Sequence, residues 1–246
     1  MKISIITVCY NSQETIKDTI ESVIHQSYDN IEYIIIDGNS NDDTCNIITS
    51  YNDSIDFFIS ENDKGIYDAI NKGIKLATGE IIGLLHADDI FDNSQVIQKV
   101  ISNFKSNKDI LYGDINYVKK DDLNQVVRRW KSSNYSQHKF KWGWMPPHTG
   151  FFLKRKCYID FGFYRLDLGS SADYELMLRM FEVHKLSSLY FPINIVKMRV
   201  GGISNSSLKN RWLANKNDKK SWEINSLKPW WFTFFLKPIL KLKQFI

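Results

Sequence analysis

The sequence is poor in the residues that would indicate a disulfide framework or a cysteine metal site. Its 246 residues contain three cysteines, Cys9, Cys45 and Cys157, and no Cys-x-x-Cys pair. An odd number of widely spaced cysteines indicates neither a disulfide framework nor a zinc site, and it favours a reducing compartment. Hydrophobic residues make up 43% of the chain and charged residues 24%. These values are ordinary for a globular protein of one large domain, with or without an appendage.

Long apolar runs are also missing. No stretch approaches the ~18 consecutive apolar residues of a transmembrane helix, so we expect none. Residues 1–8 carry one charge and a short apolar run, without the longer apolar region and cleavage site of a signal peptide, and we expect a strand there. No Gly-rich phosphate loop with a lysine occurs near residue 1, which argues against a nucleotidyltransferase.

The charge is unevenly distributed. The net charge is +4, but residues 209–246 alone carry +7, which leaves −3 for residues 1–208. A basic tail on a mildly acidic body predicts an anionic partner for the tail.

Apolar strands and amphipathic helices alternate through the first half. Continuous apolar runs predict strands at 3–9, 31–36, 55–59 and 81–85, and helical spacing predicts helices at 14–25, 43–51 and 66–77. Farther along, strands are expected at 111–118, 126–130 and 150–153, and a helix at 173–184. This order predicts an α/β fold with a mostly parallel sheet and helices on both faces.

Polar residues follow each strand of the first half. They are Asn11, Asp37, Asp63 and the adjacent pair Asp88 and Asp89. Ligands of parallel sheets bind at the carboxyl ends of the strands, and paired carboxylates there suit a hard divalent cation that keeps positions open for phosphate oxygens. The alternative is that Asp89 or Asp92 caps a helix starting near Ser94.

Six ordered segments together resemble the inverting nucleotide-sugar glycosyltransferases of family 2. The segments are 4–11 (SIITVCYN), 34–44 (IIIDGNSNDDT), 63–73 (DKGIYDAINKG), 77–80 (ATGE), 84–89 (LLHADD) and 172–176 (ADYEL). The resemblance implies a GT-A fold over residues 1–205, with a nucleotide-binding half at 1–115 and an acceptor half at 116–205. Residues 206–246 would form a helical, amphipathic tail.

The resemblance also implies an activity and a set of site residues. One sugar would move from a nucleoside-diphosphate sugar, with uridine favoured, to a hydroxyl of a glycan or polyprenyl-linked acceptor in bacterial surface-polysaccharide assembly. A hexosyl- or N-acetylhexosaminyltransferase is expected. The implied residues are Asp173 as general base, Thr7, Asn11, Asp37, Asp63, Lys64 and Asp88 on the nucleotide, and Asp88 with Asp89 on Mg²⁺ or Mn²⁺.

The chain departs from the family pattern in two places. His86 occupies the first position of the usual Asp-x-Asp metal motif, where it is either a spacer or a neutral imidazole beside the site. The processive motif is incomplete, because Leu208 precedes Arg211-Trp212, and we therefore expect one sugar per encounter. If the metal site is degenerate, the alternative function is a sugar-nucleotide-binding protein without catalysis.

Two of the implied roles have local structural alternatives. Asp173 lies in a Ser-Ser-Ala-Asp sequence that fits a helix capping box. Asp37 suits a loop acid that accepts hydrogen bonds from the backbone of residues 38–40.

Aromatic residues dominate the loop 142–148 and the tail. Trp144 and His148, with Trp142, are candidates for an acceptor-binding wall, and the alternatives for the tryptophans are the core or a membrane surface. Residues 222–246 interleave Trp and Phe with Lys, which predicts a helix lying on an anionic membrane and hence a cytoplasmic protein, peripheral on the inner face of the cell membrane. A tail that packs on the body or forms a homodimer is the alternative, and no nucleic-acid partner is expected.

Overall fold

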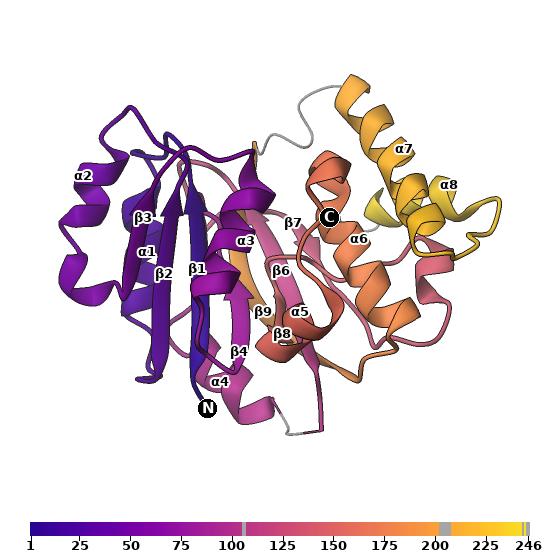
Figure 1. The fold of residues 1–246 in the computed structure, drawn as a ribbon, viewed down its shortest axis with the longest axis horizontal. Coiled ribbons are helices and arrows are strands. Elements are labelled where there is room, and N and C mark those ends of the chain that lie inside the picture. The colour runs from indigo at the N-terminus through magenta and orange to yellow at the C-terminus, as the bar shows by residue number, and fades with distance from the viewer. Residues whose placement is uncertain (105–106, 202–207, 243, 245–246) are drawn as a thin grey trace.

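The computed structural model describes residues 1–104, 107–201, 208–242 and 244. This part of the chain forms one nine-stranded sheet with the order β3-β2-β1-β4-β8-β6-β9-β5, and β7 pairs with β6 outside this path. Helices cover both faces of the sheet (Figure 1). The α/β fold predicted from the sequence is confirmed.

The parallel part of the sheet comes from the first third of the chain. It contains β1 (Ile3–Cys9), β2 (Ile31–Asp37), β3 (Phe57–Ser60) and β4 (Ile81–Leu84). β1 and β4 are buried along their full length, as expected of isoleucine-rich strands covered on both faces. Cys9 lies beside Asp37, and Asp37 beside Ser60, so three strands end together at one edge.

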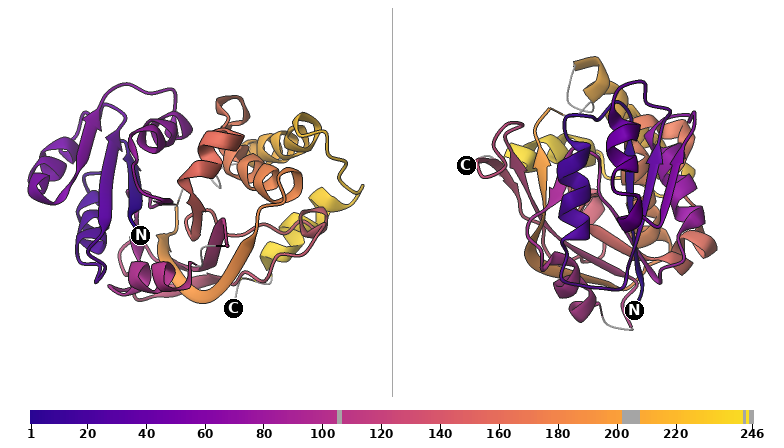
Figure 2. Two further views of the ribbon diagram at one scale, coloured as in Figure 1. Left: turned by 60° about the horizontal axis from the view of Figure 1, so that its bottom comes forward. Right: turned by 90° about the vertical axis from the view of Figure 1, so that its left-hand side faces the viewer.

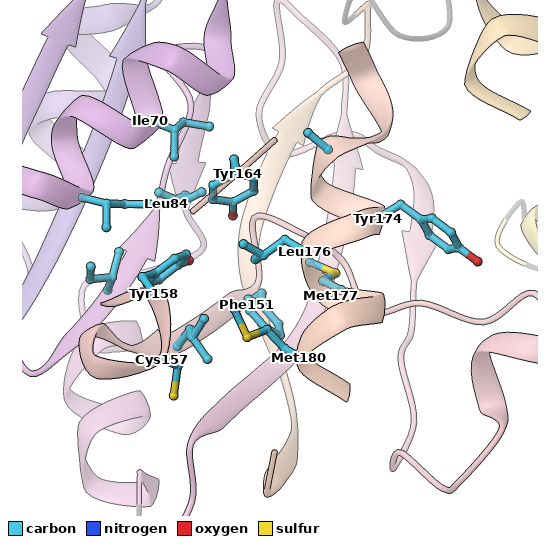
Figure 3. Packing of buried hydrophobic residues seen from close by; sticks show 14 of the residues in the cluster. Ile70, Leu84, Phe151, Cys157, Tyr158, Tyr164, Tyr174, Leu176, Met177 and Met180 are labelled. Atoms are coloured by element: carbon cyan, nitrogen blue, oxygen red, sulfur yellow. The ribbon is translucent and has the colours of Figure 1, made fainter. Parts of the chain in front are cut away.

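Successive residues of β1 face two separate cores. Ile5 packs in the core closed by α1 (Ile16–Ile24), α2 (Thr44–Thr49) and α4 (Val96–Asn103). Ile6 packs in the core closed by α3 (Ile66–Leu76), α5 (Arg155–Phe161) and α6 (Ala172–Leu178). Figure 3 shows this second core, where Leu84 of β4 and Ile70 of α3 face Tyr158 of α5 and Leu176 of α6. The alternation follows from the two-residue period of a strand.

The chain after β4 adds strands of mixed direction to the sheet. They are β5 (Asp89–Phe91), β6 (Ile110–Val118), β7 (Val126–Trp130), β8 (Phe151–Lys154) and β9 (Ser188–Arg199). β8 runs antiparallel to both β4 and β6, whereas β9 is parallel to β6 and antiparallel to β5. Neither β5 nor β9 was expected from the sequence. Their pairing places Asp89 opposite Met198, beside Arg199.

The helix expected at 173–184 is present with a different second half. After Leu178 it continues as a π-helical turn, Arg179–Val183. Arg179 bonds the carboxylate of Glu175 one turn earlier, and its guanidinium also donates to the carbonyl groups of Phe161, Gly162 and Phe163. This side chain joins the turn to the end of α5.

The tail forms two helices that pack on the body. α7 (Leu208–Ile224) lies against α6 and the 3₁₀ segment Leu166–Ser171, and α8 (Thr233–Leu242) lies against the 3₁₀ turn η2 (Lys139–Trp142). Trp222 is buried, and its indole N–H donates to the Tyr174 hydroxyl over 2.9 Å. Figure 2 shows both helices on the side of α6 away from β1–β3. The tail is therefore packed on the body, one of the alternatives kept from the sequence.

The expected boundary between residues 205 and 206 falls in 202–207, outside the described residues. The side chains of Leu208 and Arg211, on which the one-sugar expectation depends, are also outside them. Within the described ranges, no helix combines the length and apolarity needed to cross a bilayer.

Candidate active site

The turn between β4 and β5 separates the two adjacent aspartates. Asp88 is partly exposed in the turn, whereas Asp89 begins β5 with its side chain fully buried. Neither Asp89 nor Asp92 caps a helix, because the residue before α4 is Gln95, and Asp92 accepts a hydrogen bond from Asn194 instead. The alternative that Asp89 or Asp92 caps a helix is therefore wrong.

Arg199, at the end of β9, holds this turn in place. Its guanidinium donates to the Asp88 carbonyl oxygen over 2.7 Å and also bonds the Asp18 carboxylate. Its backbone N–H donates to Asp89 Oδ1 over 3.3 Å. The other oxygen, Asp89 Oδ2, is buried and has no hydrogen-bond partner. One buried carboxylate oxygen is thus left unsatisfied beside a second carboxylate.

Both carboxyl groups are harder to ionise than ordinary aspartates. Burial raises the pKa of Asp88. Burial, and then the charge of Asp88, raise the pKa of Asp89 well above its usual value. A bound cation would reverse both effects.

These residues fit a divalent cation. Among the described side chains, no group of three or more His, Cys, Asp or Glu is arranged to hold a metal ion. Mg²⁺ is commonly held by one or two carboxylates, with substrate phosphates and water completing its shell. A positive ion beside Asp88 would stabilise its carboxylate, whose pKa is raised by burial, and would provide a partner for the unpaired oxygen of Asp89.

Two imidazoles connect the β4 end to the start of α6. The ring of His86 lies 5.4 Å from the ring of His148, centroid to centroid. His148 Nδ1 lies 3.6 Å from Asp173 Oδ2. Burial, and then His148, lower the pKa of His86 to about 3, so its ring is neutral at pH 7, and its buried Nδ1 has no partner. The end of β4, which leads into the predicted metal motif, and the candidate base Asp173 therefore lie close together.

Asp173 is not engaged in the capping box. Ser171 is the residue before α6, but its hydroxyl donates to the Ala214 carbonyl over 3.0 Å and makes no cap bond. Asp173 Oδ1 accepts the backbone N–H of Tyr174, and Oδ2 faces His148. Burial, and then the charge of Asp173, raise the pKa of Tyr67 well above its usual value, so a protonated phenol from α3 stands beside this carboxylate.

The side chain of Asp37 is occupied by the protein itself. Its carboxylate accepts the backbone N–H and hydroxyl of Ser40, the hydroxyl of Ser60 and the thiols of Cys9 and Cys45. Burial would raise the pKa of Asp37, but the hydrogen bonds from the two serines outweigh it, and the pKa is lowered. These are the contacts of a loop-stabilising acid, the alternative kept from the sequence.

Asp63 has the more available carboxylate at this edge. Its Oδ1 accepts the Gly65 N–H over 2.7 Å. Its Oδ2 lies against Gly38, where an added Cβ would come within 2.7 Å of it and within 3.5 Å of the Tyr10 ring. Tyr10 is 60% exposed. Glycine at position 38 therefore keeps a carboxylate and an aromatic face close together.

Of the remaining nucleotide candidates, Asn11 and Lys64 lie at the edge of the sheet and Thr7 does not. Asn11 lies at the edge, and its side-chain oxygen accepts the backbone N–H of Asn41, while Lys64 is exposed next to Asp63. Thr7 is fully buried, with its hydroxyl 3.1 Å from that of Tyr33. The structure does not bring Thr7 to the surface that a nucleotide could contact.

Of the two acceptor candidates, one lies at the site and the other lies in the core. His148 lies at the site, beside Asp173. Trp144 instead packs in an aromatic core group with Tyr112, Phe140 and Phe181, at centroid distances of 5.5–6.0 Å. This is the core alternative for Trp144.

Arg199 and Tyr67 are site residues that the sequence analysis missed. Arg199 carried one signal, because it is a lone arginine closing a mostly apolar run just before Gly201. Tyr67 lies in the recognised segment 63–73, but nothing in the sequence indicates that it would stand beside Asp173.

Comparison with solved structures identifies the fold. The chain superposes on a mannosyltransferase from Pyrobaculum calidifontis, solved with GDP-Man and Mn²⁺, with a TM-score of 0.65 at 16% identity. The match covers 98% of this chain and 68% of that one. The fold is therefore that of the GT-A glycosyltransferases.

Sequence relatives then give the family. Residues 4–164 match the model of Glycosyl transferase family 2, and the chain belongs to that family. An uncharacterized glycosyltransferase of Mycobacterium tuberculosis is 32% identical over 181 residues, which cover 72% of this chain and 68% of the relative. The UDP-Glc:alpha-D-GlcNAc-diphosphoundecaprenol beta-1,3-glucosyltransferase WfaP of Escherichia coli is 36% identical over 121 residues, 48% of this chain and 47% of WfaP.

Proposed function

We propose that this glycosyltransferase moves one hexosyl or N-acetylhexosaminyl group from a nucleoside-diphosphate sugar to an acceptor hydroxyl, with inversion at the anomeric carbon. Asp173 takes the proton of the attacking hydroxyl. The observation that carries the proposal is the succession His86, His148 and Asp173, which sets a partly exposed carboxylate beside the strand end that bears Asp88.

His148 and Tyr67 flank the Asp173 carboxylate. His148 faces Oδ2 from the side of the β4 end, and the Tyr67 phenol stands beside the same carboxylate from α3. A positioned base of this kind contributes ~10²–10⁴ in rate. Acceptor binding falls to residues 116–205, with His148 as the contact nearest the base.

Asp88, with Asp89 behind it, would hold Mg²⁺ or Mn²⁺ in this proposal. When bound there, such an ion would neutralise the charge that develops on the leaving diphosphate. The chain's own contribution is rigidity, because Arg199 bonds the Asp88 carbonyl and the Asp89 carboxylate and so fixes the turn. His86 stays neutral beside the site and adds no charge that would repel the ion.

The nucleoside binds along residues 1–115, at the ends of β1 to β3. Asp63 Oδ2 accepts a base N–H next to the exposed ring of Tyr10, and uracil offers such a donor. Asp37 holds the loop that carries Gly38, and Asn11 and Lys64 border the same edge. A uridine donor also agrees with WfaP, whose name specifies UDP-Glc.

The tail and the relatives support a proposal for the acceptor and the location. WfaP acts on a diphosphoundecaprenol-linked sugar, and an acceptor of that class, in surface-polysaccharide assembly, is proposed here. We place the protein in the cytoplasm, peripheral on the inner face of the cell membrane. The support is the +7 charge of residues 209–246 and the exposed aromatic side chains of that segment, including Trp231 and Phe235.

The test is transfer from UDP-sugars by wild-type protein and by Asp173→Asn. Turnover should fall ~10²–10⁴-fold in Asp173→Asn while UDP affinity, measured by calorimetry with Mn²⁺, stays within about twofold. Asp160→Asn, a change at an exposed acid of α5, is the matched control and should keep full turnover. Near-normal turnover of Asp173→Asn would remove the base from the mechanism. Tight UDP binding by wild type with neither transfer nor donor hydrolysis would favour the non-catalytic alternative.

A further inference from the structure

An aromatic surface lies where the tail meets the body. It comprises Trp142 of η2 and four residues at or near the start of α8: Trp230, Trp231, Phe232 and Phe235. We call these five residues the aromatic cap. The Trp142 ring lies 5.0 Å from Trp230 and 5.5 Å from Phe232. Three members are largely exposed, Trp142 at 53%, Trp231 at 84% and Phe235 at 69%. Exposed aromatic side chains gathered in this way mark an interaction surface.

The aromatic cap is fixed to the body. Thr233 Oγ1 donates to the Lys141 carbonyl over 2.7 Å. At Gly143 an added Cβ would lie 2.7 Å from the Lys237 backbone nitrogen, so η2 and α8 are in direct backbone contact. The Lys237 ammonium pairs with the nearly buried Asp218 of α7 over 2.5 Å. The surface is therefore formed before any partner binds, and it includes a residue of the body as well as the tail.

A basic hollow adjoins the aromatic cap. Its volume is about 500 Å³, and it lies between the loop before η2, the π-helical turn after α6 and the end of α7. Lys141, Lys185 and Lys228 line it, against one acid, Glu182. Lys141 directly precedes Trp142, and its ammonium lies 5.6 Å from the centre of the Trp230 ring. Cationic and aromatic groups thus meet at one border.

We propose that this hollow binds the phosphate headgroup of an anionic phospholipid while the aromatic cap enters the membrane interface. The inference rests on the proposed membrane association and names the residues that perform it. An excess of lysine over acid complements an anionic headgroup, and tryptophan and phenylalanine suit the interfacial layer. A soluble anion would use the lysines but leave the exposed aromatic side chains without a role.

The proposal changes which residues should anchor the protein. The sequence suggested a helix lying flat along residues 222–246, but Trp222 is buried and donates to Tyr174, so it faces the body. Trp142, an acceptor candidate from the sequence, joins the membrane surface instead. The Trp212 side chain, 68% exposed on α7, lies outside the aromatic cap and the hollow and provides a matched control.

The experiment is sedimentation of the full chain with vesicles of phosphatidylcholine alone or mixed with phosphatidylglycerol. Wild type should bind only the mixed vesicles. Lys141→Gln/Lys228→Gln should bind ~10-fold or more weakly, since each lysine near an anionic surface contributes about fivefold. Trp231→Ala/Phe235→Ala should weaken binding by at least a similar factor. Lys219→Gln and Trp212→Ala, at exposed positions of α7, should stay within twofold of wild type.

The failures of the two proposals are distinguishable. Absence of wild-type binding to the mixed vesicles would overturn membrane association and the headgroup site together. Normal wild-type binding with an unaffected lysine double variant would overturn the headgroup site alone. If Trp231→Ala/Phe235→Ala instead dissociates a homodimer and leaves vesicle binding unchanged, the aromatic cap is a subunit interface and the proposal fails. Thermal unfolding of each variant confirms that these surface changes leave the fold intact.

Discussion

Replacing Trp222 with alanine should destabilise the whole domain, although this residue lies in the tail. Trp222 is 1% exposed, and its indole N–H bonds the Tyr174 hydroxyl over 2.9 Å. Figure 3 shows Tyr174 leaving α6 on the side opposite Leu176, which faces the core. Trp222 therefore fastens α7 to α6, the helix whose first turn carries the proposed base Asp173.

The magnitude follows from this burial. Removing a fully buried tryptophan costs ~3–5 kcal/mol, a large part of the ~5–15 kcal/mol that keeps a domain folded. For a chain of this length, each kcal/mol lowers Tm by ~2–4 °C, so Tm should fall by roughly 6–20 °C. Tyr174→Phe removes only the hydrogen-bond acceptor and should cost ~1–3 kcal/mol, because the indole N–H stays buried without a partner.

Differential scanning calorimetry measures these changes. The control is Trp212→Ala in the same helix, where the side chain is 68% exposed and the expected change is within ~0.5 kcal/mol. A Tm of Trp222→Ala within about 2 °C of wild type would refute the reasoning and return residues 206–246 to the status of an independent appendage.

Three further outcomes follow from the site and the core. Asp63→Asn should weaken UDP binding ~10-fold or more in calorimetry, whereas Asp37→Asn should mainly lower the free energy of unfolding, by ~1–3 kcal/mol; the reverse pattern would exchange their roles. Hydrogen bonds from Lys2, Ser4 and Thr78 lower the pKa of the Glu32 carboxyl to about 2 against the opposing effect of burial, so its stabilisation is complete above the unfolded value near 4.5 and is lost as the pH falls toward 2. Urea unfolding should therefore show Glu32→Gln less stable than wild type at pH 7, with a difference that shrinks below pH 4.5, and a constant difference would contradict the assignment. Gly143→Ala should cost ~1–2 kcal/mol or more in thermal unfolding, since φ is +76° and the new methyl group would meet Lys237; an unchanged Tm would contradict the close packing of η2 and α8.

Much of the fold could be predicted because local signals were strong. The isoleucine runs of β1 and β2 and the helical spacing of α1 and α3 gave elements that the structure contains within a few residues. β5 was missed because a strand of three residues is too short to show an alternation of polar and apolar residues. β9 was missed because its side chains are mostly only partly buried, so that its polar and apolar residues follow no clean alternation.

The candidate site was predictable to the same extent. Asp88 and Asp173 could be found because each stands at a strand end or helix start within a recognisable segment. The surroundings of Asp37 could not be read from the sequence, since its five donors come from four separate positions of the chain. Tyr67 and Arg199 reach the site through contacts of α3 and β9 that no local pattern encodes.

The sequence by itself determined the parallel half of the sheet and the acids at its carboxyl edge, because strand period and apolar runs are local properties. Only the tertiary structure decided which acids remain available, that His148 stands between His86 and Asp173, and that the tail packs on α6. Those outcomes depend on burial and on hydrogen bonds between residues far apart in the chain, and these exist only once the chain has folded.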